Sequence, residues 1–141
     1  MRYAILHHTA WPGKSDHYDL LVQVREGGEN DRFLKAFFTE SNALPVPSQP
    51  GETRRESRLM AQEDHRIAYL TYQGQVGGGR GRVVRVDEGE CEHLAEPTRE
   101  ELKCRLTGKH LRGVCRLRHL GQAVWIMERI EDPVVSGPAG R

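Results

Sequence analysis

The feature that most constrains this chain is the lack of any long amphipathic helical pattern, together with turn signals that recur at about ten-residue spacing. The segments between these turns alternate apolar and polar residues, as strands with one buried face do. Clear examples are 17–25, 102–107 and 123–130. Eight or nine short strands with this spacing predict an all-β fold, either a sandwich or a barrel.

Length and composition set the broad limits. At 141 residues the chain is expected to form one domain over 1–130, and 131–141 is rich in Pro and Gly and is expected to be a flexible tail. With 21 basic and 20 acidic residues, the chain is nearly neutral, so its composition does not imply a positive potential over the whole surface that would attract nucleic acid. No apolar run is long enough for a membrane span, so we expect no membrane association.

The three cysteines match neither a zinc knuckle nor a paired disulfide framework. Their odd number and the lack of a signal peptide predict a reduced, cytoplasmic protein. Cys91, Cys104 and Cys115 are expected to be small buried hydrophobic residues, and His93 receives no role.

The richest cluster of possible metal ligands lies near the N-terminus, where strand-like segments flank a Trp-Pro-Gly turn. His17 and Asp19 are two residues apart, so on a strand their side chains share one face. His7 or His8 could reach them across a hairpin. Two nitrogens and one oxygen suit Mn, Zn or Fe(II). The alternative is a polar strand face that binds no metal.

Further along, 40–56 is rich in Pro and Ser and predicts a long surface loop. Its end carries Arg54, Arg55 and Arg58, which indicate either a solvated charged loop or a phosphate contact. The glycine-rich 75–81 lacks the ending of a P-loop and is expected to be a mobile turn. We also expect a strand over 82–87, a turn at Gly89 and a partner strand over 90–94.

Taken in order along 2–130, the motifs resemble the 3′-phosphoesterase domain of bacterial ATP-dependent DNA ligase D and its stand-alone relatives. The motifs that carry this resemblance are His8, His17-Tyr18-Asp19, Glu63-Asp64-His65 with Tyr69, Gly74, Asp87-Glu88-Gly89, 102–113 and Trp125.

The resemblance implies a compact β-barrel of about eight short antiparallel strands with long loops and at most a short helix. It also implies a manganese-dependent phosphoesterase that removes a 3′-ribonucleoside or 3′-phosphate from DNA or RNA ends, with a separate DNA ligase or repair proteins as candidate partners. Zinc or another divalent metal is the alternative cofactor. Carried over by position, the implied metal ligands are His8, His17 and Asp19, the catalytic residues His65, Tyr69 and Glu63, and the phosphate-binding residues Arg58 and Arg80.

Two departures from the family pattern bear on function. The step from His8 to His17 is longer, which a loop tolerates. More seriously, Leu21 stands where the family has an arginine that contacts phosphate. Either Arg58, Arg66 or Arg80 replaces that arginine, or the chain is a catalytically impaired module that binds nucleic-acid ends or proteins.

Overall fold

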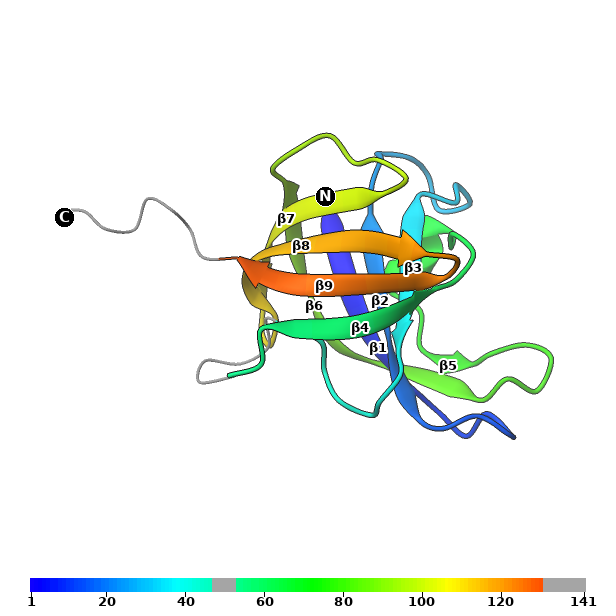
Figure 1. Ribbon diagram of the computed structural model, residues 1–141. Coiled ribbons are helices and arrows are strands. Elements are labelled where there is room, and N and C mark those ends of the chain that lie inside the picture. Colours follow the sequence, from blue (N-terminus) through cyan, green and yellow to red (C-terminus); the bar gives the residue numbers. More distant parts are fainter. Residues whose placement is uncertain (47–52, 131–141) are drawn as a thin grey trace, which may run out of the picture.

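The structure is a computed structural model that describes residues 1–46 and 53–130, and it is built almost entirely of strands (Figure 1). The expected tail over 131–141 and part of the expected loop over 40–56 lie outside the described residues. The elements are β1 (Arg2–Thr9), β2 (His17–Gln23), β3 (Leu34–Thr39), β4 (Glu56–Ala61), the 3-10 helix η1 (Ile67–Leu70), β5 (Gly74–Gln75), β6 (Arg82–His93), β7 (Glu101–Gly108), β8 (Arg112–Gly121) and β9 (Val124–Ile130).

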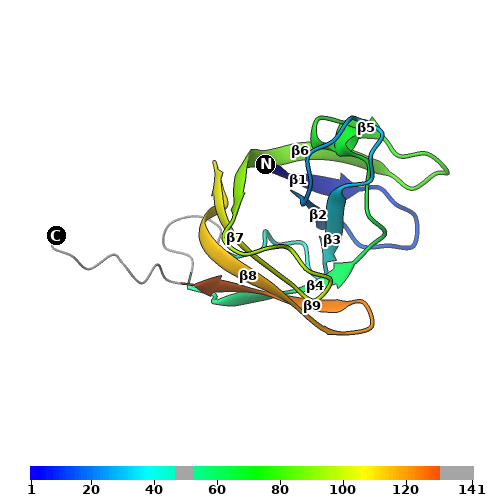
Figure 2. The same ribbon diagram turned by 90° about the horizontal axis from the view of Figure 1, so that it is seen from above.

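Eight of these strands close into one antiparallel barrel in the order β1-β2-β3-β4-β9-β8-β7-β6, and the β1–β6 pairing completes the ring. Figure 2 shows this ring from above. The short β5 pairs with β6 outside the barrel. The all-β barrel expected from the sequence is therefore confirmed. In the described part of the chain, no helix is long and apolar enough to cross a membrane.

Residues on the inward face of each strand form one apolar core. Its largest fully buried side chains include Tyr3, Phe37 and Met127, which come from strands far apart in the sequence. Phe37 meets Trp125 edge to face, with ring centroids 5.2 Å apart. Burial of apolar surface against this core, at about 25 cal/mol per Å², holds the strands together.

A second, smaller apolar cluster covers the outward face of β1, β2, β3 and β6. Leu6 and Leu21 contribute to it from the sheet, and Leu70 of η1 packs on them. The face of β2 that carries His17 and Asp19 is therefore buried as well, because η1 lies over the barrel wall at this point. This second layer makes a shielded site possible on the outside of a small barrel.

Two expectations about individual strands are wrong. Gly89 does not form a turn, and β6 runs without a break from Arg82 to His93. Gly89 instead pairs with Gly108 of β7, where an added Cβ would lie 2.1 Å from the Thr107 carbonyl oxygen. Arg58 does not lie in a loop, because β4 begins at Glu56 and pairs with β9.

Candidate metal centre and its cavity

Three buried side chains meet on the outer face of the β1–β2 hairpin. His8 and His17 are direct cross-strand partners, and Asp19 follows two residues later on the same face of β2. The Asp19 carboxylate lies between the two rings, with His8 Nδ1 at 2.9 Å and His17 Nε2 at 3.3 Å. All three residues are less than 7% exposed, His8 and Asp19 at 6% and His17 at 4%. Their donor atoms lie within 4.8 Å of one another, so this group could hold a metal ion.

The distal nitrogens of both histidines face backbone carbonyls. His8 Nε2 lies 2.6 Å from the Arg80 carbonyl oxygen, and His17 Nδ1 lies 2.9 Å from that of Ser15. A carbonyl only accepts hydrogen bonds, so each of these nitrogens must carry a proton. In a neutral imidazole the other nitrogen, the one that faces Asp19, then bears a lone pair.

Lone pairs on two nitrogens and one carboxylate therefore point at each other. Positive charge between them removes this repulsion, and it comes either from a proton on each nitrogen or from a cation bound among the three groups. A histidine that ligates a metal usually donates its other N–H to a carbonyl or carboxylate, as both histidines do here. Gln62 Nε2 also donates to Asp19 Oδ1 at 3.1 Å and holds the carboxylate in place.

His8 and Asp19 shift each other's pKa values. Burial lowers the pKa of His8, but the hydrogen bond to Asp19 and the contact with the Arg80 carbonyl outweigh it, so this pKa lies above its usual value. Burial raises the pKa of Asp19, but hydrogen bonds from His17 and His8 outweigh it and hold this pKa below its usual value. The raised pKa of His8 and the lowered pKa of Asp19 both favour an ionised Asp19 carboxylate next to positive charge.

The structure distinguishes His8 from His7, which the sequence left as alternatives. His7 lies on the inward face of β1, where it stacks on Tyr18 with ring centroids 4.5 Å apart and contacts Asn42 Oδ1 through Nε2 at 2.9 Å. Trp11 stacks on His8 instead, at 5.1 Å between centroids. Of these two histidines, only His8 belongs to the group around Asp19, together with His17.

A cavity of about 470 Å³ opens beside His8 and Asp19. It is lined by several residues that the sequence singled out, namely Glu63, His65, Arg66, Tyr69, Arg80 and also Leu21. Sequence reasoning missed Trp11, Arg32 and Gln62, which line it too. Trp11 lies in the Trp-Pro-Gly turn and Gln62 directly precedes Glu63, but no motif assigned a role to either residue or to Arg32, and only the fold brings the three to the site.

His65 is held on the wall of this cavity by its own backbone. His65 exchanges two backbone hydrogen bonds with Leu34, at 2.8 and 3.0 Å, and its Nδ1 lies 2.7 Å from the Glu63 carbonyl oxygen. This contact places a proton on Nδ1 and leaves Nε2 available for exchange. The Tyr69 ring, on η1, packs edge to face against His65 at 5.4 Å. His65 and Tyr69, two of the catalytic residues that the resemblance implies, therefore lie in contact at this cavity.

Three arginines give the cavity a positive lining. Arg32 donates to the Asp64 carbonyl at 3.1 Å, Arg80 donates to the Gly77 carbonyl at 2.7 Å, and Arg66 lies over the Tyr69 ring at 5.6 Å. All three side chains are exposed. These contacts use only part of each guanidinium, which has five N–H donors.

Arg58, by contrast, is not brought to the cavity, although the sequence placed it among the phosphate-binding residues. It pairs with Glu40 at 2.6 Å between Nε and Oε1. The reason is that β4 and β3 are paired, so the start of β4 lies beside the end of β3, where Glu40 follows.

Among known proteins, no family model and no curated sequence matches this chain.

Proposed function

We propose that this chain is a metal-dependent phosphoesterase that processes the 3′ ends of DNA or RNA in the cytoplasm, by removing a 3′-phosphate or a 3′-ribonucleoside. One observation carries the proposal: the His8–Asp19 group, His65, Tyr69 and a set of arginines line the same cavity. Ligands for a cation, a group that can exchange a proton and positive charge for a phosphate are the parts that such a reaction requires.

The donor set fits a borderline divalent ion. His8 Nδ1, His17 Nε2 and an Asp19 oxygen would hold it, and manganese is our first choice, with zinc or another divalent ion as the alternative. Such an ion polarises a phosphoryl oxygen and lowers the pKa of bound water. The Arg80 and Ser15 carbonyls keep both imidazoles in the tautomer that a metal requires.

The other cavity residues supply the remaining chemistry. On a 3′-phosphate, water attacks phosphorus and loses a proton to solvent, the bond from phosphorus to the 3′ oxygen breaks, and His65 in its imidazolium form donates a proton from Nε2 to that leaving oxygen and regains one from solvent. On a 3′-ribonucleoside the bond that breaks is the one from phosphorus to the 5′ oxygen of that nucleoside. The Tyr69 hydroxyl donates a hydrogen bond to a phosphate oxygen. Glu63 lines the cavity, and its backbone carbonyl holds the His65 ring.

Positive charge from other segments compensates for Leu21. Leu21 is fully buried and lines the cavity, and its apolar side chain cannot donate a hydrogen bond to a phosphate as an arginine at this position would. Arg80 and Arg66, which the sequence offered as substitutes, line the cavity, and Arg32 adds a third guanidinium. Charged hydrogen bonds from a guanidinium to phosphate are about twice as strong as neutral ones.

The test is manganese-dependent phosphate release from a 3′-phosphorylated DNA primer-template. We expect release by the wild type and a loss of at least about 100-fold in Asp19→Asn and His8→Asn, since both remove a ligand. The matched control is His7→Asn, one residue away on the opposite face of β1. It should keep both manganese binding and phosphate release.

The pattern of losses distinguishes the proposal from the alternatives. Manganese binding without phosphate release by the wild type would indicate a module that binds nucleic-acid ends or partner proteins, such as a separate ligase, with Leu21 as the cause. Equal activity in wild type and Asp19→Asn would show that the metal group is not catalytic. Arg80→Met should raise the KM for the primer, whereas Arg112→Met on β8 should leave it unchanged.

A further inference from the structure

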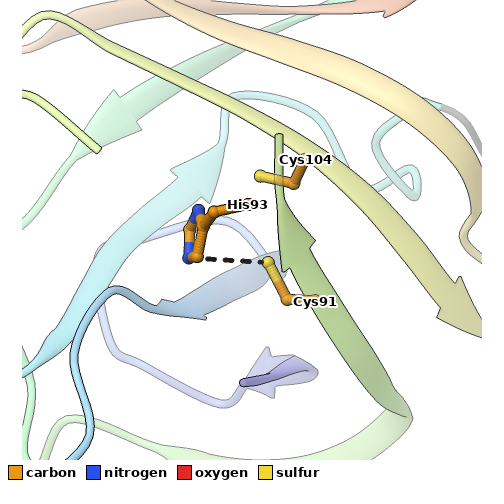
Figure 3. Close-up of side chains that lie close together, drawn as sticks. All are labelled: Cys91, His93 and Cys104. Carbon is orange, nitrogen blue, oxygen red and sulfur yellow. Dashed lines mark hydrogen bonds between the residues drawn. The ribbon is translucent and has the colours of Figure 1, made fainter. Parts of the chain in front are cut away.

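A second group of possible metal ligands lies inside the barrel, on the inner face of β6 and β7. Cys91 and His93 are two residues apart on β6 and share one face, and Cys104 of β7 is the direct cross-strand partner of His93. Figure 3 shows the two thiols and the imidazole close together. One donor atom from each residue lies within 4.8 Å of the others.

The two ring nitrogens of His93 differ in their surroundings. Nε2 lies 2.7 Å from the Gln23 carbonyl oxygen and 3.9 Å from Cys91 Sγ, the contact drawn as a dashed line in Figure 3, and the carbonyl requires that this nitrogen carry the proton of the neutral ring. Nδ1 therefore bears a lone pair, and this buried atom has no hydrogen-bond partner among the described residues. Buried polar atoms without a partner are rare and call for an explanation, of which a bound ion is one.

A third thiol lies next to this group, although it is not among the donor atoms that lie within 4.8 Å of one another. Cys115 of β8 is the direct cross-strand partner of Cys104. His93, Cys104 and Cys115 thus form a row across three neighbouring strands, with Cys91 beside it. All three cysteines are free and buried. Their spacing along the chain resembles no zinc motif because the strand register, and not a short loop, brings them together.

The chemistry of these donors differs from that of the His8 group. Thiolate sulfur and imidazole nitrogen select zinc, whereas carboxylate and imidazole also suit manganese. Contact with Cys104 and burial both raise the pKa of Cys91, and contact with Cys115 is the largest cause that raises the pKa of Cys104. A cysteine thiol releases its proton when it binds zinc, so binding at this group depends on pH.

We propose that Cys91, His93 and Cys104 bind a structural Zn²⁺ ion, and that Cys115, the cross-strand partner of Cys104, becomes the fourth ligand after a side-chain shift. The ion joins β6 to β7 at the end of the barrel where the Met1 carbonyl accepts a hydrogen bond from Cys91 N. This site lies on the opposite face of the barrel wall from the cavity, and it is independent of the function proposed above.

The first test uses Co²⁺ as a spectroscopic probe on the full chain under reducing conditions. We expect thiolate-to-cobalt charge-transfer absorption and the visible bands of a tetrahedral ion in the wild type. His93→Gln replaces a half-buried ring and should weaken cobalt affinity by more than about tenfold, the lower end of what even an outer partner of a ligand contributes. His8→Asn is the matched control and should keep the thiolate bands.

Two results would overturn the proposal. One is a wild-type protein that shows no thiolate absorption with Co²⁺, and the other is a His93→Gln variant with unchanged affinity. Where the variant fails to fold, X-ray absorption of the Zn²⁺-loaded wild type decides: sulfur neighbours at about 2.3 Å support the site. A first shell that contains only nitrogen and oxygen refutes it.

Discussion

Tyr3 and Asp87 form a polar pair in the middle of the apolar core. The Tyr3 hydroxyl donates to Asp87 Oδ2 at 2.8 Å. The same carboxylate accepts backbone N–H groups from the β7–β8 turn, from Lys109 at 2.8 Å and Leu111 at 2.9 Å. Because a buried carboxylate needs such partners, Asp87 fixes both the start of β1 and this turn. Burial first, and then the bond to Asp87, raise the pKa of Tyr3.

We expect Tyr3→Phe to lower the free energy of unfolding at neutral pH by about 1–3 kcal/mol, since a buried charged acceptor loses one donor. The folded-state pKa of Tyr3 is raised, so this contribution is present in full below the unfolded-state pKa of about 10 and is lost as pH rises beyond it. Urea denaturation of both proteins across this range measures the effect. A difference that stays constant above pH 10 would contradict it.

At the candidate metal site of His8, His17 and Asp19, the sequence shows which residue types converge but not the strand register. The period of a strand places His17 and Asp19 on one face, and this is how the structure has them. The choice between His7 and His8 depends on the pairing across the hairpin, which a loop of unusual length leaves open. The cysteine row could not be predicted either, because it depends on the register of three strands at once.

Among the elements, β6 does the most to organise the molecule. It pairs with β1 on one side to close the barrel and with β7 on the other, and β5 continues along it outside. Gly89 lets this long strand pair closely with β7, because an added Cβ would lie 2.1 Å from the Thr107 carbonyl oxygen. Its partner Gly108 leaves room for the Tyr3 hydroxyl, which lies where a Cβ would stand.

Gly89→Ala should therefore destabilise the fold by on the order of 1–3 kcal/mol, because its Cβ would meet backbone of β7 that cannot move without breaking the ladder. Gly77→Ala is the control, since no atom lies within 4 Å of its Cβ. Thermal unfolding of both variants gives the comparison. Similar melting temperatures would show that β6 and β7 can separate locally at little cost.

The sequence predicted most strands well because apolar and polar residues alternate clearly in them. It failed where the same residue type is common both in turns or loops and in paired strands. Glycine signals a turn in most contexts, but at Gly89 it permits close pairing of two strands. Arg58 follows a proline-rich stretch, yet it already belongs to β4. Both errors concern long-range pairing, which no local pattern contains.

On the scale of the whole molecule, the barrel is a wall one sheet thick with different chemistry on its two sides. β6 illustrates this: Val83 joins the outer cluster beside the cavity, while Cys91 joins the inner core. The outer group of His8 opens to a cavity, and the inner cysteines have almost no exposed surface.

That separation has a kinetic consequence. An ion at the outer group can exchange through the cavity, whereas an ion among the cysteines lies beside thiols that are at most 1% exposed, with only His93 half-buried, so we expect its release to depend on local opening of the strands. We expect a chelator to strip Mn²⁺ rapidly and Zn²⁺ slowly, at a rate that follows the unfolding rate as denaturant is added. Indicator absorbance after mixing measures both, and equal rates would contradict the expectation. The inner ion would then be acquired as the chain folds and kept for its lifetime, while the outer one follows the supply of metal in the surroundings.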